Sequence, residues 1–190
     1  MLAVFSIMFR FVRLAALTAL IAAASPAATL EKLSLDELAL RSTAIVIGRA
    51  GESRAEGGGA LIFTVRPFRV EEQWKGESID TVRVSLPGGS LNGVVQRFGG
   101  VPQLKPGVEY LLFLWRGPSG RTQVTGLSQG VFEVLRSGDA VARVRRRAGG
   151  DVLITPGGSR EEAAQALETT LSALSGRIKA ALGAAEVGGP

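Results

Sequence analysis

The sequence predicts a mainly β fold, an antiparallel barrel or sandwich with a helix near each end. Short segments rich in β-branched and aromatic residues recur at regular spacing between glycine turns, as in such folds. Two other segments, 33–42 and 159–182, repeat apolar residues at helical spacing. With 190 residues, 46% of them hydrophobic and 21% charged, the chain has enough apolar material for one ordinary domain.

Residues 1–28 have the pattern of a secretory signal peptide. Arg10 and Arg13 form a basic region, and Leu14–Ala24 is an apolar run too short to span a bilayer comfortably. An uncleaved anchor is the alternative interpretation. Small residues follow the apolar run, and cleavage is expected after Ala24, Ala27 or Ala28.

The segment predicts a bacterial protein that is exported, either periplasmic or secreted. Met8 is an alternative start to Met1, because it places the basic region closer to the N-terminus. Removing residues 1–28 lowers the formal net charge from +5 to about +3. The chain has no cysteine, so an exported form has no disulfides and depends on its hydrophobic core.

The first folded element is expected to be a short helix at 33–42. Ser34 is a suitable N-cap, and Glu37 completes a capping box. A buried strand is expected at 43–50 and a flexible connection at 51–59. The helix should bury a face made of Leu35, Leu38 and Ala39.

A long strand is expected at 61–74, with a change of face in its middle. Large apolar residues occupy odd positions before Pro67 and even positions after it. A β-bulge at Pro67 would restore the alternation, and proline within a strand favours a bulge or an edge.

Further strands should follow at regular intervals. Residues 80–86 alternate as a half-buried strand, with Val82, Val84 and Leu86 inward. The glycine-rich and proline-rich segment 87–107 is expected to be an irregular loop with one short strand. The apolar segment 108–115 should be a central strand, followed by three short strands before residue 147.

The C-terminal region predicts an amphipathic helix of about 20 residues, packed on the barrel, which we place at 157–183 after a barrel domain at 29–156. Ser159 and Glu162 form a second capping-box pattern. A partner-binding helix is the alternative. Residues 184–190 are expected to be a disordered tail. The apolar face consists of Leu167, Leu171, Leu174, Ile178 and Leu182.

The segment GLSQG, residues 126–130, matches the G-x-S-x-G pattern of serine hydrolases. A nucleophile elbow needs a helix after the serine and a base beside it. The chain has no histidine, and the residues after Gly130 alternate like a strand. We therefore interpret Ser128 as a turn residue. A Ser–Lys dyad remains as an alternative, with Lys32, Lys75, Lys105 or Lys179 as the base.

The sequence indicates no cofactor and no metal site. Typical zinc and soft-metal sites are excluded without histidine or cysteine, and no calcium-loop pattern is present. The segment PGGSLNG at 87–93 lacks the Gly-Lys ending and the following helix of a phosphate-binding loop. Glu71 and Glu72 should face opposite sides of a strand, which makes them a poor catalytic pair.

Arg143, Arg145, Arg146 and Arg147 form the one basic cluster of the sequence. It can attract an anionic polymer or lipid, or it can be a strand with an arginine-rich solvent face. The second interpretation is favoured, and specific nucleic-acid binding is not expected, because no aromatic residues alternate with the arginines to stack on bases.

The order of segments resembles that of a group of uncharacterised exported bacterial proteins, and more distantly that of netrin and tissue-inhibitor-of-metalloproteinase domains. The resemblance covers residues 33–136 and depends on the V-x-G-R strand, the W-K-G turn at Trp74–Gly76 and the P-G-x-x-Y-L-L-F strand at 106–113. It implies an OB-like barrel. It does not imply protease inhibition, because the inhibitors use an N-terminal cysteine that is missing here.

These observations together predict a non-enzymatic, exported binding module, whose partner is an exported protein or a cell-surface polymer. The candidate surface is the 87–107 loop with Trp74 and Arg97, although core packing of Trp74 is the favoured alternative. Two alternative functions remain, namely an unfamiliar hydrolase that uses Ser128 or a carboxylate pair, and a polyanion-binding protein. The latter would bind through Arg143–Arg147, with Arg145, Arg146 and Arg147 as the candidate binding residues.

Overall fold

The structure is a computed structural model. It describes residues 30–58, 60–138, 140–147, 153–154, 160–161 and 166–187. The expected signal peptide and the capping pattern of Ser159 and Glu162 lie outside these ranges. No helix in the described ranges has the length and apolar character needed to cross a bilayer.

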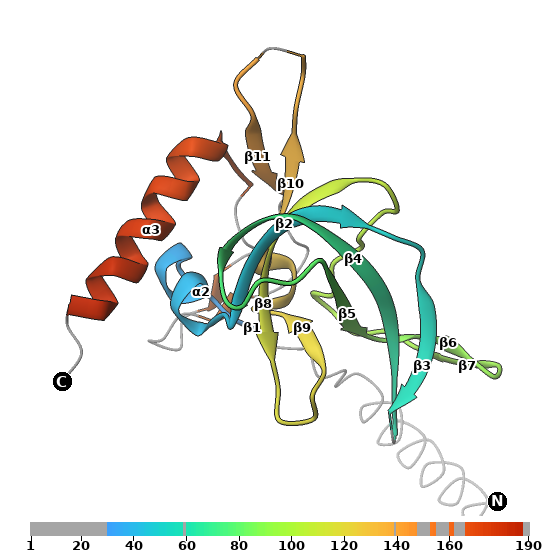
Figure 1. The fold of residues 1–190 in the computed structure, drawn as a ribbon. Coiled ribbons are helices and arrows are strands. Elements are labelled where there is room, and N and C mark those ends of the chain that lie inside the picture. The colour runs from blue at the N-terminus through green and yellow to red at the C-terminus, as the bar shows by residue number, and fades with distance from the viewer. Residues whose placement is uncertain are drawn as a thin grey trace, which may run out of the picture.

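Five strands close into a barrel at the centre of the molecule (Figure 1). Their order is β8-β2-β4-β5-β9, and β9 pairs back with β8. Neighbouring strands are antiparallel except β5 and β9, which run parallel and meet at Val84 and Thr122. The expected OB-like barrel is therefore confirmed. Its strands are β2 (Ala44–Ala50), β4 (Leu61–Lys75), β5 (Thr81–Pro87), β8 (Glu109–Arg116) and β9 (Thr122–Val124).

Other strands extend the barrel at its edges. The segment expected to be a flexible connection contains β3 (Arg54–Gly58), which pairs with β4. Within the 87–107 loop, two strands form a hairpin, not one. The hairpin consists of β6 (Gly89–Leu91) and β7 (Val94–Gln96). Beyond β8, the large sheet continues with β10 (Val131–Leu135), β11 (Arg143–Arg146) and β14 (Leu167–Thr170). A small separate sheet consists of β1 (Leu30–Glu31), β12 (Leu153–Ile154) and β13 (Arg160–Glu161).

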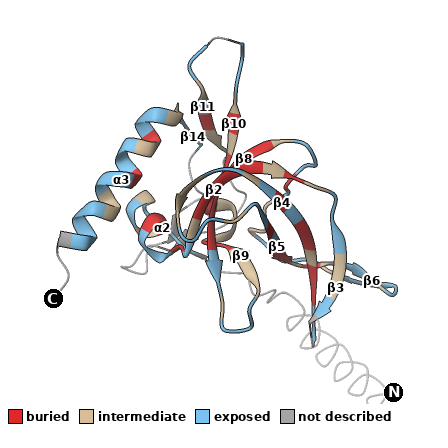
Figure 2. Cartoon of the chain, in the orientation of Figure 1, coloured by how far each residue is buried: buried red, intermediate tan, exposed pale blue. Residues whose placement is uncertain are grey.

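The apolar side chains form two cores, one on each face of the central strands. Figure 2 shows buried residues along β2, β4, β5 and β8. The inner core fills the barrel. The outer core lies between the sheet and two helices, α2 (Leu35–Arg41) and α3 (Leu171–Val187). Helix α2 has the expected capping box, in which the Ser34 and Glu37 side chains bind each other's backbone N–H groups. Leu38 and Ala39 are fully buried in this outer core.

The C-terminal helix begins later and ends later than the sequence predicts. Residues 167–170 form strand β14, which pairs with β11, so Leu167 is not part of the helix. Leu174 and Ile178 are buried, and Leu171 and Leu182 pack beside them. Residues 184–187, expected in a disordered tail, are helical.

The bulges of β4 lie closer to its end than expected. Pairing with β5 continues without interruption past Pro67, so the predicted bulge at that residue is wrong. Shifts in the β2–β4 register instead leave Glu71 and Trp74 as the extra residues. Pro67 is tolerated because it lies where β4 changes partner from β2 to β3, and there its carbonyl accepts the N–H of Gly51 at 2.8 Å.

Gly48 allows β2 and the bulged part of β4 to approach closely. A Cβ at this position would lie 1.9 Å from the carbonyl oxygen of Arg69 and 3.0 Å from the Phe68 ring. Backbone atoms cannot move aside as a flexible side chain does, so no other residue fits without displacing β4.

We predict that Gly48→Ala lowers the free energy of unfolding by about 3 kcal/mol, because the added methyl group forces the two strands apart. Gly183→Ala is the control: this helical glycine has no neighbours around its Cβ position, and alanine should stabilise α3 by about 0.5–1 kcal/mol. Urea unfolding followed by circular dichroism measures both. Equal stability of Gly48→Ala and the native chain would contradict the close approach.

Candidate functional site

One mouth of the barrel opens into a cavity of about 600 Å³. Thr64 and Arg66 point into it from β4, because residues two apart share a face of a strand. Barrel mouths are common positions for ligand sites. Apolar walls come from β5, the β6–β7 hairpin and the segment after it, through Leu86, Val95, Phe98, Val101 and Leu104.

Hydrogen bonds hold the hairpin and the following segment over this mouth. The Gln96 side chain accepts the N–H of Ile62 at 2.7 Å and donates to the carbonyl of Ala60 at 2.9 Å. The Lys105 N–H donates to the Tyr110 hydroxyl at 3.0 Å. The mouth is therefore built by contacts between segments far apart in the sequence.

The turn of the hairpin has a signal that the sequence analysis missed. Asn92 and Gly93 both have positive φ, 50° and 78°. Asn-Gly between two short apolar segments is the strongest short-range signal for a two-residue β-hairpin. This signal locates β6 and β7 within a segment that otherwise reads as irregular.

Arg66 is the central polar group of the cavity and was not singled out from the sequence. Its side chain is 9% exposed, and one Nη donates to the carbonyl of Gly51. Its Nε is buried without a hydrogen-bond partner. No carboxylate in the described ranges lies within ion-pair distance of it. Buried charges are normally paired, because removing an ion from water is costly.

Glu109 is a second buried charge, and it has the ion-pair partners expected of a structural charge. Glu109 is 5% exposed and receives Arg49 and Arg136, each at 2.8 Å. Of the charged side chains classed as buried in the described ranges, Glu109 is paired twice and Arg66 is unpaired. Arg66 thus differs from Glu109, the other charge classed as buried among the described residues, while Arg145 and Arg146, which are less buried, also have an Nε without a partner.

The charge around the cavity has a single sign. Arg97 and Lys105 also line it, and none of its lining residues is aspartate or glutamate. An anion in this cavity would face three cationic side chains, and the planar guanidinium of Arg66 can bind a carboxylate or phosphate through two donors. The cavity therefore has the chemistry of an anion-binding site with apolar walls.

The structure separates Trp74 from Arg97. Arg97 is exposed at the barrel mouth, within the predicted surface. Trp74 packs against the outer core near Leu182, and its indole N–H donates to Glu72 at 2.7 Å. The two residues predicted to share a surface therefore line different hollows.

The arginine cluster is also divided between two faces. Arg145 and Arg147 lie on the face of β11 and its continuation that points away from the outer core, and both pair with Glu133, at 3.4 and 3.1 Å. Arg146 points to the other face, 5.4 Å over the Phe132 ring, where burial lowers its pKa. Arg143 pairs with Glu168 at 2.8 Å. The cluster is a strand whose arginine-rich face points away from the outer core, and Arg146 is not part of that face.

Ser128 lies in a tight turn and not in a nucleophile elbow. Residues 127–130 form the 3-10 helix η2 (Leu127–Gly130), and strand β10 follows directly. The Ser128 N–H donates to the carbonyl of Gly100 at 3.0 Å. Both glycines of the motif have structural reasons, since Gly126 has a φ of 65° and a Cβ at Gly130 would lie 2.2 Å from the Thr125 carbonyl.

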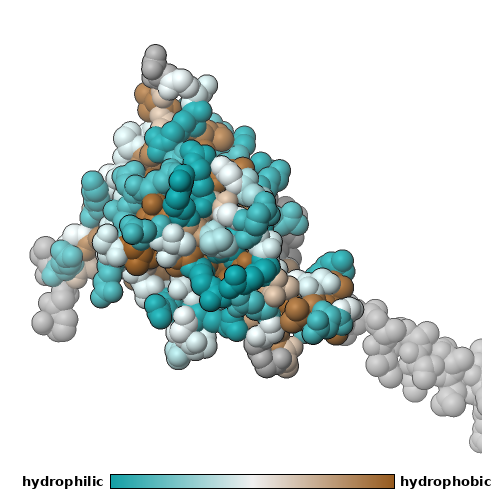
Figure 3. All heavy atoms as spheres, turned by 45° about the vertical axis from the view of Figure 1, so that its right-hand side comes forward, coloured by the Kyte–Doolittle hydropathy of each residue, from teal (hydrophilic) through white to brown (hydrophobic). Residues whose placement is uncertain are grey.

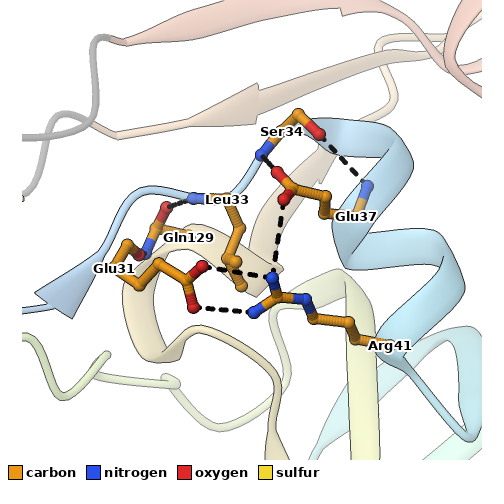
Figure 4. A network of polar contacts seen from close by, with 6 residues as sticks. All are labelled: Glu31, Leu33, Ser34, Glu37, Arg41 and Gln129. Carbon is orange, nitrogen blue, oxygen red and sulfur yellow. Dashed lines mark hydrogen bonds and ion pairs between the residues drawn. The ribbon is translucent and has the colours of Figure 1, made fainter. Parts of the chain in front are cut away.

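Gln129 gives the same turn a second structural role (Figure 4). It is 1% exposed, its side-chain oxygen accepts the N–H of Leu33 at 2.8 Å, and its nitrogen donates to the carbonyl of Glu31 at 2.8 Å. The Arg41 guanidinium in turn binds the Glu31 carboxylate. GLSQG therefore anchors the N-terminal segment of the folded chain.

Of the lysines considered for a Ser–Lys dyad, Lys105 lines the same hollow as Ser128, whereas Lys75 donates to the carbonyls of Ala39 and Leu40. The carboxylate pair gains no geometry. Glu71 binds Arg49 and Arg69, whereas Glu72 binds the Trp74 indole, so these carboxylates do not face a common point. Within the described ranges, no three metal-ligating side chains come together. On the face drawn in Figure 3, hydrophobic side chains form small groups among hydrophilic ones.

No protein-family model, curated protein or solved structure matches this chain.

We predict that Gln129→Leu lowers the free energy of unfolding by about 2–3 kcal/mol, because it leaves two backbone groups near Leu33 without partners. The neighbouring Ser128→Ala variant leaves those two backbone groups paired and should lower it less than Gln129→Leu does. Urea unfolding of both variants is the measurement. A Ser128→Ala variant that loses esterase or peptidase activity present in the native chain would restore the hydrolase hypothesis.

Proposed function

We propose that this protein is an exported, non-enzymatic binding module that holds an anionic group of its ligand at the barrel mouth. The unpaired, buried Arg66 is the observation that supports this proposal. Burying a guanidinium without a carboxylate partner costs desolvation free energy. A ligand with a negatively charged group would supply the ion-pair partner that Arg66 lacks within the protein.

The outer face of the barrel offers a weaker site. OB-like barrels commonly bind ligands on the face of their second and third strands, here β4 and β5. On this side Glu56 pairs with Arg54 at 2.7 Å and also with Arg83. The cations near this face are therefore compensated within the protein, whereas those of the barrel mouth are not.

Export is proposed from the pattern of residues 1–28, with Arg10, Arg13 and the apolar run after them. A protein in that compartment meets other exported proteins and cell-surface polymers, and both commonly carry carboxylate or phosphate groups. Fractionation of cells that express the complete chain tests this part of the proposal. Recovery of all the protein in the cytosol at its full mass would contradict it.

We predict that citrate and inorganic phosphate raise the melting temperature of the chain from residue 29 onward, but not that of its Arg66→Met variant. Binding to the folded state alone stabilises it by an amount that grows with the logarithm of ligand concentration above Kd. Arg69→Met is the matched control, because Arg69 lies on the same strand with its side chain 71% exposed. Equal shifts in all three proteins would show that the anions do not act at Arg66.

The same variants make a capture experiment specific. Immobilised native chain, Arg66→Met and Arg69→Met are exposed to periplasmic and secreted extract of the source organism, and bound proteins are identified by mass spectrometry. The expected partner is retained by the native chain and Arg69→Met and lost from Arg66→Met. Unfolding of Arg66→Met, with a loss of more than about 2 kcal/mol of stability, would instead make Arg66 a structural residue.

A further inference from the structure

A second hollow adjoins the cavity at the barrel mouth. It has a volume of about 310 Å³ and lies between β8, β10 and the face of β11 that carries Arg145. Pro102, Gln103 and Lys105 line both spaces, so the short segment 102–105 is the ridge between them. A ligand that extends beyond the first cavity over this ridge enters the second.

The second hollow also carries excess positive charge. Arg145, Arg147 and Lys105 line it, and Glu133 is the one acidic residue among its lining residues. The Nε of Arg145 is buried without a hydrogen-bond partner. Tyr110, whose hydroxyl already accepts the Lys105 N–H, also reaches this hollow. The polar groups required by a second anion are therefore present beside the first site.

Glu133 occupies the position that a ligand carboxylate would take. One oxygen, Oε2, receives both Arg145 and Arg147. Burial alone would raise the pKa of Glu133, but hydrogen bonds from Arg147 and Arg145 outweigh it and hold the pKa below its usual value. Because a single oxygen is used, each guanidinium keeps donors for a further carboxylate.

The geometry points to one continuous groove that binds an extended acidic peptide segment of a partner protein. One carboxylate of the peptide pairs with Arg66 at the barrel mouth, and a second pairs with Arg145 and Arg147 beyond the ridge. This inference rests on the proposed function, whose Arg66 site it extends, and it assigns the partner as a protein. The cations of each hollow outnumber its carboxylates, and this excess favours a negative charge in each.

The walls favour a peptide over an acidic polysaccharide. Phe98, Val101 and Leu104 line the first cavity, and Val108 and Val131 line the second. Aliphatic side chains between two acidic residues would cover these walls and remove apolar surface from water. A polysaccharide carries hydroxyl groups along its length, and these would lose hydrogen bonds to water against such walls.

Fluorescence anisotropy with synthetic peptides tests the inference. The probes are labelled twelve-residue peptides of alanine, valine and leucine with two glutamates at spacings of two to eight residues, and matched peptides with one glutamate replaced by glutamine. At one spacing, the two-glutamate peptide should bind the native chain at least about tenfold more tightly than either single-glutamate peptide. Arg66→Met should abolish binding of both kinds.

Two sets of variants locate the second carboxylate. In the double variant Arg145→Gln, Arg147→Gln, the two-glutamate peptide should bind no better than the single-glutamate peptide. Glu133→Gln should increase its affinity severalfold, because an internal competitor is removed. Arg143→Gln, with a side chain 54% exposed and paired with Glu168, is the control and should change nothing.

The outcomes separate this inference from the proposed function. Affinity that depends on Arg66 but not on Arg145 and Arg147 would overturn the second subsite and leave the anion site at the barrel mouth intact. Affinity independent of Arg66 would overturn the proposed function as well. Polygalacturonate and heparin serve as competing probes, and their tight binding without any peptide binding would replace the peptide with an acidic polysaccharide.

Discussion

Closure of the five-stranded ring is the constraint on which the rest of the molecule depends. β9 is three residues long, yet it pairs with β8 on one side and meets β5 at a single parallel position on the other. This closure separates an inner core from an outer one and creates the mouth where Arg66 lies. It also requires β2 and β4 to approach within the space that only Gly48 allows. Closure of the barrel therefore determines both the fold and the position of the candidate site.

Charge placement divides the protein into a compensated part and an uncompensated part. Ion pairs around Glu56, Glu109 and Glu133 join strands that are distant in sequence, and each of these carboxylates meets at least two arginines. With 22 basic and 17 acidic residues, the chain has cations left over. The basic residues near the 97–106 segment that have no acidic partner in the described ranges line a cavity. Because they face this cavity as well as open solvent, their excess positive charge favours the binding of anions there.

The sequence predicts elements well where local signals agree with the tertiary environment. The capping box of Ser34 and the alternation of β5 both located their elements. Leu167 was misassigned because its spacing fits a helix, whereas pairing of β14 with β11 determines its conformation. Arg66 was missed for a related reason. A charged residue in a strand is normally assigned to solvent, and only the fold shows that its even position places it with Thr64 and Phe68 on the inward face.

The hydrogen bonds of Gln129 to the segment before α2 affect when the chain can fold during its synthesis. Leu33 and its partner are 96 residues apart, and the space beneath α2 is completed by strands that are synthesised later still. A growing chain that ends before residue 122 has all of β2, β4 and β5, yet it lacks the strand that closes the ring. A chain that ends before residue 129 still lacks the amide that secures its beginning. Folding of this protein is therefore a late event in synthesis, with high contact order, and the nascent chain stays open until β9 has emerged.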